Sequence, residues 1–429
     1  MKQVVIIGNG IAGITAARYI RKMSEHRITV ISSETDHFFS RTALMYIYMG
    51  HMKYEHTKPY EDWFWEKNRI DLVNAHVASI DTTYKTLHYD TGATLHYDIL
   101  ILATGSKPNK FGWPGQDLEG VSGMYSMPDL RYIEKYTHDI KRGVIVGGGL
   151  IGVELAEMLH SKGIEVTFLV RESSFWNMVL PAKESALVGR HILEQGIDMR
   201  LKAQLGKIIA DEHGRVKSVI TDQGEEIPCG FVGLTAGVSP GIDFVKPTEI
   251  KTDRGILVNE FLETNIPDVY AIGDCAQHVT SPGKRRPVEQ VWYTGRMQGE
   301  TVAYTICGSK TKYKPGIWFN SAKFFDIEYQ TYGWVWNEMK PNEESFYWEN
   351  RAGDKCLRLV YDRQSRALLG INVFGIRLQH EVAEAWIKKK QKVDEVVRDL
   401  KTANFDPEFF KKYENEIAQG FTREAVSQN

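Results

Sequence analysis

The hydrophobic pattern of this chain repeats one arrangement twice: a short apolar run, a glycine-rich turn and an amphipathic helix. The first copy is VVIIGNGIAGITAARYI, close to residue 1, and the second is KRGVIVGGGLIGVELAE, which begins at residue 141. In both copies, β-branched residues typical of a buried parallel strand lead directly into the glycines. The pattern therefore predicts two strand–turn–helix units, each opening a βαβ fold.

The segments that follow the first helix and those that follow the second helix also show similar types of hydrophobic pattern. The first helix is followed by an apolar run, ITVISSE, then by alternating segments in HVASIDTTYKTLHYDTGATLHYD and by the apolar run Ile99–Leu102. The second is followed by a strand over 165–172, a helix over about 183–195, a strand pair in RVKSVITDQGEEIPCG and a last run in FVGLTAGVSP. Strands that alternate with helices indicate a parallel sheet, and the alternating segments indicate an antiparallel meander. The repeated order indicates an internal duplication.

Each glycine-rich turn has the spacing GxGxxG. Between a strand and a helix, this spacing is typical of dinucleotide binding: one glycine forms the tight turn, one lets the backbone approach a pyrophosphate, and one allows close helix–strand packing. The start of the helix then offers unpaired N–H groups to the phosphates. A glycine turn in an unrelated α/β protein is the alternative, but two complete copies favour two bound dinucleotides. The glycines are Gly8, Gly10 and Gly13, and Gly147, Gly149 and Gly152.

An acidic residue follows each glycine turn at about the spacing that suits a ribose hydroxyl. Glu34 ends the second strand of the first half, and a surface glutamate is the alternative interpretation. In the second half, Glu172 lies 20 residues past Gly152, where a carboxylate would hold the 2′-hydroxyl of NADH. The adjacent Arg171 would instead suit the 2′-phosphate of NADPH. A carboxylate repels that phosphate and no further Lys or Arg follows in SSFWNMVLP, so we expect NADH unless both residues only face solvent.

Composition and charge agree with a multidomain globular protein. The 429 residues exceed what one hydrophobic core normally serves, 42% of them are hydrophobic, and the formal net charge is −2. This balance argues against nucleic acid or an anionic membrane as the main partner, and no apolar stretch reaches the roughly 20 residues of a membrane span. The run Val4–Gly8 is interpreted as a strand rather than as a signal peptide, so a cytoplasmic location is expected.

Four cysteines are widely separated in the sequence: Cys229, Cys275, Cys307 and Cys356. They form no CxxC pair and have no metal-ligand spacing. We therefore expect free thiols in a reducing compartment and no metal site.

The later part of the chain changes character twice. The segment NIPDVYAIGDCAQ predicts a short strand, Val269–Ile272, stopped by Gly273 and Asp274, with a helical segment after it. From about residue 313 the segments alternate like antiparallel strands, and a charged helical tail begins at Leu378. The basic run Lys388–Lys390 is interpreted as a solvated helix face, with a docking patch for an acidic partner as the alternative.

Five segments, in order along the chain, carry a resemblance to a known family: GNGIAG, YDILILATGSKP, GGGLIGVE, LTAGVSP and VYAIGDCAQ. The chain resembles the FAD-dependent pyridine nucleotide-disulfide oxidoreductases, and the ATG and GD elements are the specific ones. The resemblance implies an α/β fold: two Rossmann-like dinucleotide-binding domains, each three-layered with a parallel sheet and an antiparallel meander, plus a C-terminal α+β domain. It implies an FAD-binding domain split over 1–112 and 244–312, an NAD(P)H-binding domain at 113–243, and a C-terminal domain at 313–429 that contributes to a dimer or partner surface.

The same resemblance implies roles for individual residues. The first glycine turn would hold the FAD pyrophosphate, Glu34 the ribose, Arg41 the flavin phosphates and Asp274 the ribityl chain, although Asp274 alternatively caps the following helix. The second glycine turn would hold the NAD(P)H pyrophosphate, and Glu154 would lie toward the space between the two rings. The other residues expected beside a cofactor are Thr104, Gly105, Gly273 and Trp292.

The chain departs from the disulfide-reducing relatives at two places. Their redox cysteine position falls on Ala43, and no cysteine precedes Cys229. Their C-terminal His–Pro pattern corresponds to TANFDPEFF, which has Pro407 but no histidine. Without a thiolate there is no nucleophile for a disulfide, so disulfide reduction is disfavoured.

The cysteine-less branch, which includes ferredoxin and rubredoxin reductases, is the better match. Many of its members carry a lysine near the flavin N5, where Tyr46 stands in this chain. The SRTALMY pattern looks closer to the flavin module of nitrite reductases.

The resemblance implies hydride transfer from C4 of a reduced nicotinamide to N5 of FAD. This chemistry belongs to the cofactors, so no catalytic side chain is named. The leading hypothesis is an NAD(P)H oxidoreductase that passes electrons to a protein acceptor such as an iron–sulfur carrier. Two alternatives stay open: an oxidase or reductase of a small quinone-like acceptor, and a redox-sensing flavoprotein with slow turnover.

Overall fold

The computed structural model describes residues 1–283, 285–405 and 411–427. The chain folds into two compact units, each assembled from segments that are distant in sequence. The first unit comprises Met1–Phe111, Gly120–Asp139 and Leu234–Pro315, and the second comprises Gly112–Glu119, Ile140–Gly233 and Gly316–Asn429.

A five-stranded parallel sheet forms the centre of the first unit. The apolar runs of its inner strands are buried along almost their whole length, as expected for parallel strands covered on both faces. In register, Val4 pairs with Ile28 on one side and with Ile99 on the other. The strands, in spatial order, are β19 (Val269–Ala271), β7 (Ile99–Leu102), β1 (Gln3–Ile7), β2 (Arg27–Ser32) and β3 (Ile70–Asn74).

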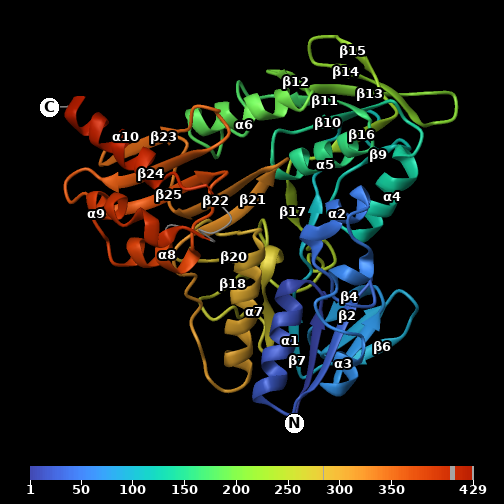
Figure 1. Ribbon diagram of the computed structural model, residues 1–429. Coiled ribbons are helices and arrows are strands. Elements are labelled where there is room, and N and C mark those ends of the chain that lie inside the picture. The colour runs from blue at the N-terminus through green and yellow to red at the C-terminus, as the bar shows by residue number, and fades with distance from the viewer. Residues whose placement is uncertain (284, 406–410, 428–429) are drawn as a thin grey trace. The chain divides into compact units, whose positions relative to one another are not determined.

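Two helices of the first unit, α1 (Ile11–Met23) and α7 (Trp292–Ile306), pack side by side (Figure 1). Small residues permit this close approach. A Cβ at Gly299 would overlap the carbonyl oxygen of Ala12, and a Cβ at Gly295 would already touch Ile11. Because α1 starts directly after the first glycine turn, its packing against α7 fixes the direction in which the first N–H groups of α1 point.

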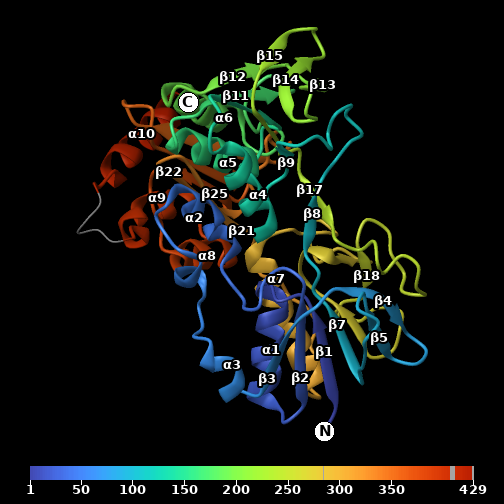
Figure 2. The same ribbon diagram turned by 90° about the vertical axis from the view of Figure 1, so that its right-hand side faces the viewer.

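Shorter elements complete the first unit (Figure 2). An antiparallel meander joins β4 to β6, β8 pairs antiparallel with β17, and β18 pairs parallel with β20. The bounds are β4 (Val77–Asp81), β5 (Thr86–Tyr89), β6 (Thr94–His96), β8 (Ser106–Pro108), β9 (Val121–Ser122), β17 (Val238–Pro240), β18 (Ile256–Val258), β20 (Ala276–His278), α2 (Leu44–Met49), α3 (Trp63–Lys67), α4 (Met127–Thr137) and the 3-10 helices η1 (Arg41–Ala43), η2 (Tyr54–Thr57) and η3 (Gly273–Cys275).

The second unit opens with another strand–turn–helix arrangement. Its sheet runs β12-β11-β10-β16, with β10, β11 and β12 parallel, and an antiparallel meander joins β13 to β15. A Cβ at Gly233 would overlap the side chain of Leu155, so the glycine lets helix α5 lie close to the sheet. The bounds are β10 (Arg142–Val146), α5 (Leu150–Ser161), β11 (Glu165–Val170), α6 (Ala182–Glu194), β12 (Asp198–Leu201), β13 (Leu205–Ala210), β14 (Val216–Thr221), β15 (Glu226–Pro228) and β16 (Phe231–Leu234).

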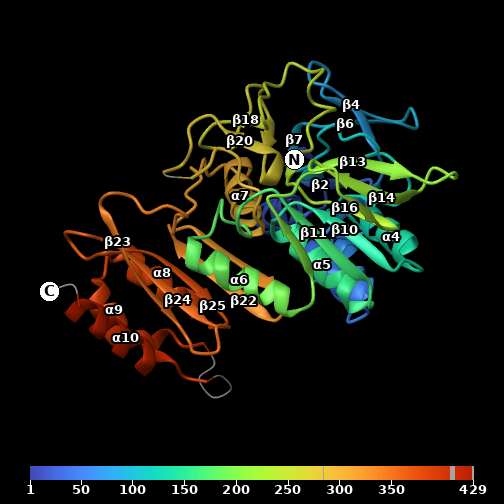
Figure 3. The ribbon, with the colours of Figure 1, turned by 90° about the horizontal axis from the view of Figure 1, so that it is seen from above.

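The C-terminal part of the second unit is an antiparallel sheet in the order β21-β22-β25-β24-β23. Helix α8 packs on β22 and β25, and α10 packs on β23 and on α9, as Figure 3 shows from above. The core beneath them is aromatic and aliphatic, with Tyr332, Leu357 and Ile371 fully buried. The bounds are β21 (Phe319–Phe324), β22 (Ile327–Gly333), β23 (Glu343–Glu349), β24 (Cys356–Asp362), β25 (Leu368–Phe374), α8 (His380–Lys388), α9 (Val393–Arg398), η4 (Leu400–Ala403) and α10 (Glu414–Ser427).

The hairpin between β21 and β22 anchors this sheet to helices α5 and α6. Its turn places Phe325 at a positive φ of +55°, an uncommon conformation for a bulky residue. The Phe325 ring packs edge-on against His160 of α5 and His191 of α6, and Asp326 contacts His191 Nε2 at 2.5 Å. We infer that this packing compensates for the backbone strain.

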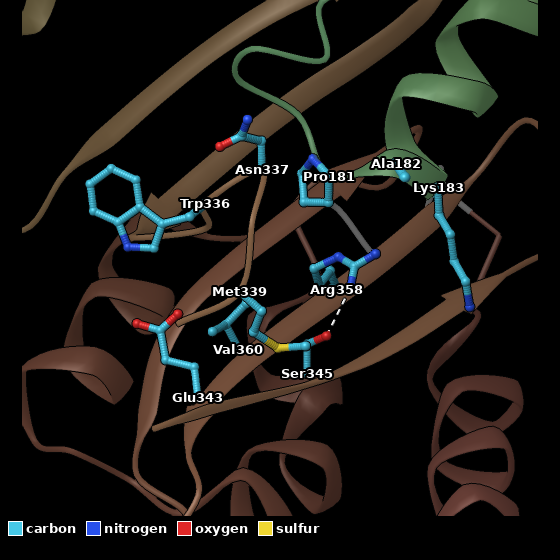
Figure 4. Close-up of a pocket in the computed structure, with 10 residues that line it drawn as sticks. All are labelled: Pro181, Ala182, Lys183, Trp336, Asn337, Met339, Glu343, Ser345, Arg358 and Val360. Carbon is cyan, nitrogen blue, oxygen red and sulfur yellow. Dashed lines mark hydrogen bonds between the residues drawn. The ribbon is translucent and has the colours of Figure 1, made fainter. Parts of the chain in front are cut away.

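A buried ion pair joins α6 to the C-terminal sheet. Arg358 donates from Nε and Nη2 to the two carboxylate oxygens of Glu184 at 2.6 and 2.8 Å, and from Nη1 to Ser345 at 2.8 Å. The Glu184 side chain is 0% exposed and that of Arg358 is 11% exposed. Beside the pair lies a cavity of about 240 Å³ between the start of α6 and strands β23 and β24 (Figure 4).

The predicted fold class is confirmed: two Rossmann-like parallel sheets precede a C-terminal α+β part. The helix expected over about 183–195 spans Ala182–Glu194, and the strand expected over 165–172 ends at Val170. Strands β3, β12 and β13 have no counterpart among the predicted segments, and the first strand of the C-terminal part starts at Phe319 rather than near residue 313. The domain boundaries 1–112, 113–243, 244–312 and 313–429 stay predictions, as does a dimer through the last of them. Among the described residues, no helix is long and apolar enough to cross a membrane.

Arg358→Met is expected to destabilise the second unit by about 3–5 kcal/mol, because it leaves the Glu184 carboxylate buried without its partner. The free energy of unfolding is measured by urea titration. The double variant Glu184→Gln/Arg358→Met should recover most of the loss. Arg363→Met, which removes an exposed pair with Glu344, is the matched control and should change stability by less than about 1 kcal/mol. Equal effects for Arg358→Met and Arg363→Met would contradict the prediction.

Candidate dinucleotide-binding sites

The first glycine turn connects β1 to α1, and two of its glycines are required by the fold itself. Gly8 has a φ of +114°, which favours glycine, and a Cβ there would overlap the carbonyl oxygen of Ala103 on the neighbouring strand end. A Cβ at Gly13 would overlap the carbonyl oxygen of Gly8. These two glycines let strand and helix approach each other, as the motif predicts.

Gly10 has a different environment. It is the N-cap of α1 in an extended conformation, with a φ of −71°, and no side chain caps the helix. A Cβ at Gly10 would meet no protein atom within 4 Å. The space in front of the first turn of α1 is therefore open where the helix dipole favours an anion, so this turn fits a pyrophosphate.

Glu34 and Arg41, predicted for the ribose and the phosphates, bind each other. Arg41 donates from Nη1 and Nη2 to the two Glu34 carboxylate oxygens at 2.9 and 2.7 Å, and from Nη1 to the carbonyl oxygen of Tyr125 at 2.6 Å. The backbone N–H of Met127 also donates to Glu34 Oε1, at 2.8 Å. The Arg41 guanidinium lies over the Tyr125 ring, 4.6 Å from its centroid.

The pairing of Glu34 with Arg41 still leaves hydrogen-bonding positions on both side chains for a ligand. A carboxylate has about four acceptor positions and a guanidinium five N–H donors. Three contacts on Glu34 leave one acceptor position on Oε2 for a ribose hydroxyl, and three donated bonds leave Nε and one N–H of Nη2 on Arg41. Arg41 therefore positions Glu34 directly, whereas its predicted phosphate contact would use only the remaining donors.

Asp274 lies at the other end of the same network. It follows β19 and Gly273, in η3, and its Oδ2 accepts from the Ser106 hydroxyl at 3.1 Å and from the Tyr125 hydroxyl at 3.2 Å. Burial raises the pKa of Asp274. Gln290 donates to Ser106 at 2.7 Å, which extends the network toward the start of α7.

The turn at Thr104 and Gly105 lies against this network. The Thr104 hydroxyl donates to the Gly241 carbonyl at 2.8 Å, which ties the end of β7 to the segment after β17. A Cβ at Gly105 would stand 2.7 Å from the Tyr125 hydroxyl, so glycine leaves room for that ring. At Gly273, the backbone N–H donates to Gln298 of α7 at 2.6 Å.

Sequence reasoning missed Tyr125, Ser106 and Gln290. Tyr125 precedes α4, and none of the five recognised segments includes it. Ser106 lies inside the recognised segment YDILILATGSKP, and Gln290 lies two residues before Trp292, but neither has a pattern of its own that predicts a role. Trp292 begins α7, with its ring edge-on to Tyr293, and Tyr46 on α2 stacks on His51.

The second glycine turn repeats the geometry of the first. Gly147 has a φ of +115°, and its N–H donates to the Leu169 carbonyl on β11 at 3.0 Å. Gly149 is the N-cap of α5 without a side-chain cap, and a Cβ there would meet no protein atom within 4 Å. Gly152 is buried in the first turn of α5. The same argument as for Gly10 makes this turn fit a second pyrophosphate.

Arg171 and Glu172 follow the carboxyl end of β11, beside this turn, and form an ion pair at 2.7 Å. The Arg171 side chain is 70% exposed, whereas that of Glu172 is 19% exposed. Arg171 is therefore mostly exposed to solvent, and Glu172 is the more buried of the two charged side chains at this strand end.

Glu154 lies one turn into α5 and carries a perturbed carboxyl group. Burial, together with the nearby carboxylate of Glu157, raises the pKa of Glu154 to about 7. Glu157 is itself buried, and it accepts from Lys323 of β21 at 2.8 Å. The carboxyl at the predicted nicotinamide end of the helix therefore changes charge near neutral pH.

The four cysteines are free thiols, and Ala43 stands at the position aligned with a redox cysteine. Ala43 ends η1, and burial raises the pKa of the thiols of Cys229, to about 12, and of Cys275, Cys307 and Cys356. Pro407 lies outside the described residues. Within the described part of the chain, no group of three or more His, Cys, Asp or Glu side chains is placed to hold a metal ion.

Comparison with known proteins identifies relatives with these features. A family model described as pyridine nucleotide-disulphide oxidoreductase matches residues 2–299. The chain is 30% identical to a nitrite reductase (NAD(P)H) of Bacillus subtilis over 76% of this chain and 40% of that protein. It is 28% identical to the biphenyl dioxygenase system ferredoxin–NAD(+) reductase component of Paraburkholderia xenovorans, over 70% of this chain and 73% of that one.

Solved structures share the fold. A ferredoxin reductase from Rhodopseudomonas palustris superposes with a TM-score of 0.79 at 23% identity, over 87% of this chain and 91% of that one. The chain spans less than half the length of the Bacillus subtilis nitrite reductase. The family model, by contrast, covers more than half of this chain, and the two glycine turns lie inside it. The chain belongs to the pyridine nucleotide-disulphide oxidoreductase family, a family of oxidoreductases whose members bind FAD and NAD(P)H.

Proposed function

We propose that this chain binds FAD at the first glycine turn and NAD(P)H at the second, and that it passes electrons from the nicotinamide through FAD to a protein acceptor. The observation that carries the proposal is the pair of uncapped helix starts, at Gly10 and Gly149, each with open space in front of it. An anion-binding helix start on each of two Rossmann-like sheets supports two dinucleotides in one chain.

The first site would hold FAD through both hydrogen-bond donors and hydrogen-bond acceptors. The N–H groups at the start of α1 would bind the pyrophosphate, and the free acceptor position of Glu34 would take an adenosine ribose hydroxyl. Asp274, oriented by Ser106 and Tyr125, would accept from the ribityl chain. Arg41 would orient Glu34 for the ribose contact, because its guanidinium pairs with both carboxylate oxygens.

The second site would prefer NADH. The half-buried Glu172 carboxylate stands beside the second glycine turn, where it would accept from a 2′-hydroxyl and repel a 2′-phosphate. Arg171 is mostly exposed and paired with Glu172, so it offers a phosphate little net positive charge.

When bound, the two cofactors supply the redox chemistry, in which a hydride passes from nicotinamide C4 to flavin N5. The chain's own residues bind and orient the cofactors. We assign no proton transfer to a side chain in this half-reaction, and Trp292 and Tyr46 remain proposed neighbours of the flavin.

A protein acceptor is favoured over a disulfide. The position aligned with the redox cysteine is Ala43, and every thiol has a pKa raised by burial, which leaves little thiolate at neutral pH. The relative named as a ferredoxin–NAD(+) reductase component supports an iron–sulfur protein as the acceptor. This chain corresponds to only part of the longer nitrite reductase, which supports a second possibility of the same class, a partner subunit as the acceptor.

We expect Gly10→Val to abolish the yellow colour of the purified protein without unfolding it. The φ of −71° suits any residue, and the new side chain would occupy only the space assigned to the pyrophosphate. FAD per chain is measured by absorbance after denaturation, and folding by circular dichroism. Gly13→Val is the contrasting variant, because its Cβ overlaps the Gly8 carbonyl and should destabilise the fold itself. A folded Gly10→Val protein with one FAD per chain would overturn the FAD assignment.

Stopped-flow spectroscopy is expected to give fast flavin reduction by NADH, slow reoxidation by oxygen and fast reoxidation by an oxidised ferredoxin. Glutathione disulfide should react no faster than with free flavin, and Cys275→Ser should behave like the unaltered protein. Fast reoxidation by oxygen would instead support the oxidase, and slow reduction with a long-lived complex would support the redox sensor. Disulfide turnover that depends on any cysteine would contradict the proposal.

Glu172→Ala is expected to weaken NADH binding by about tenfold or more, because a hydrogen bond to a charged group contributes roughly 1.5–3 kcal/mol. NADPH binding should be unchanged or stronger, since the repelling carboxylate is gone. Arg171→Ala is the control and should leave the NADH preference intact. The affinities are measured by flavin reduction at varied nucleotide concentration. A wild-type preference for NADPH that Arg171→Ala abolishes would show that the NADH assignment is wrong.

A further inference from the structure

An ion pair between the C-terminal sheet and α5 has no part in the family pattern described above. Lys323 of β21 donates to Glu157 Oε1 at 2.8 Å, and Glu157 is only 7% exposed. A buried carboxylate without a partner is costly, and Lys323 supplies the counter-charge to Glu157 inside the protein.

The fold holds Lys323 in place through the hairpin that follows it. Phe325 packs between His160 and His191, and Asp326 contacts His191. Across the β21–β22 ladder, Lys323 stands opposite Glu328, but that carboxylate forms a bidentate pair with Arg377. The Lys323 ammonium is therefore directed to Glu157, on the helix that begins at the second glycine turn.

Glu157 lies one helical turn from Glu154, on the same face of α5. Like charges at this spacing repel, so the charge on Glu157 acts directly on the Glu154 carboxyl, whose pKa is about 7. On β10 and β11, which pack against α5, Arg142 pairs with Glu165. That pair sits at the amino ends of β10 and β11, toward the far end of the helix, and His160 lies one turn beyond Glu157.

We propose that Lys323 is a positioning residue for the nicotinamide site: by neutralising Glu157, it sets the pH at which Glu154 becomes charged. This inference rests on the proposed function, which places Glu154 beside the nicotinamide. The C-terminal sheet thereby acts on the nucleotide site without touching the ligand: Lys323 acts on Glu157, and Glu157 acts on Glu154.

The charge on Glu154 distinguishes the two redox forms of the nucleotide. The oxidised nicotinamide ring carries a positive charge and the reduced ring carries none. An ionised Glu154 would therefore stabilise NAD⁺ relative to NADH, and a protonated one would not. Because the group is an acid with a raised pKa, the preference for NAD⁺ should be lost as the pH falls through about 7 and should be complete above it.

The test measures the dissociation constants of NAD⁺ and of tetrahydro-NAD, an NADH analogue whose uncharged ring cannot give up a hydride to FAD, by isothermal titration calorimetry between pH 5.5 and 9. In the wild-type protein, the ratio of the two constants should change with a midpoint near pH 7. In Lys323→Met, the negative charge of Glu157 is no longer offset, so it opposes ionisation of Glu154 more strongly. The midpoint should therefore rise by on the order of one pH unit.

Matched variants separate this role from a structural one. Lys323→Arg keeps the charge and should restore the wild-type midpoint. Glu157→Gln in the Lys323→Met background removes the uncompensated carboxylate and should return the midpoint toward neutral pH. A Lys323→Met midpoint equal to that of wild type would overturn the inference.

Glu154→Gln separates the inference from the proposed function. It should remove the pH dependence of the ratio altogether. A transition that persists in Glu154→Gln would show that Glu154 does not face the nicotinamide, whereas NAD⁺ and tetrahydro-NAD that fail to bind at all would overturn the proposed nucleotide site itself.

Discussion

The rest of the structure depends on two helix starts that no side chain caps. At Gly10 and Gly149 the first N–H groups of α1 and α5 face open space, and the absence of a Cβ is what keeps that space open. Unpaired N–H groups and an unneutralised dipole end are unfavourable for the free protein, and an anion relieves both. Neighbouring glycines and parallel strands hold both helix starts in position. The packing of α7 on α1 additionally holds the first of them.

Around the first helix start, the polar groups form one connected network rather than separate ligand contacts. Glu34, Arg41, Tyr125, Asp274 and Ser106 are joined by hydrogen bonds that run from the predicted ribose end to the predicted ribityl end. Such a network is rigid when fully paired, so its members can present remaining acceptor positions to a ligand without a large loss of side-chain entropy.

Ion pairs join the two parts of the second unit, and in each of them the carboxylate is buried. Glu184 with Arg358 and Glu157 with Lys323 both connect a helix of the nucleotide-binding part to the C-terminal sheet. Buried pairs of this kind contribute modest net stability but strongly penalise separation, because each charge would be left without a partner. Glu157 of the second pair lies one helical turn from Glu154, and this position gives the pair the electrostatic role that we propose for the nucleotide site.

The sequence by itself determined the fold class, the two glycine turns and the positions of Glu34, Asp274 and Glu172 at strand ends, because these follow from local periodicity and short spacing. Only the tertiary structure decided that Arg41 binds Glu34, that Tyr125 joins Asp274, and that Lys323 reaches Glu157. The partners in the last two pairs are 149 and 166 residues apart. No local pattern encodes such contacts, because they arise only when separate elements pack and each buried charge must find a partner.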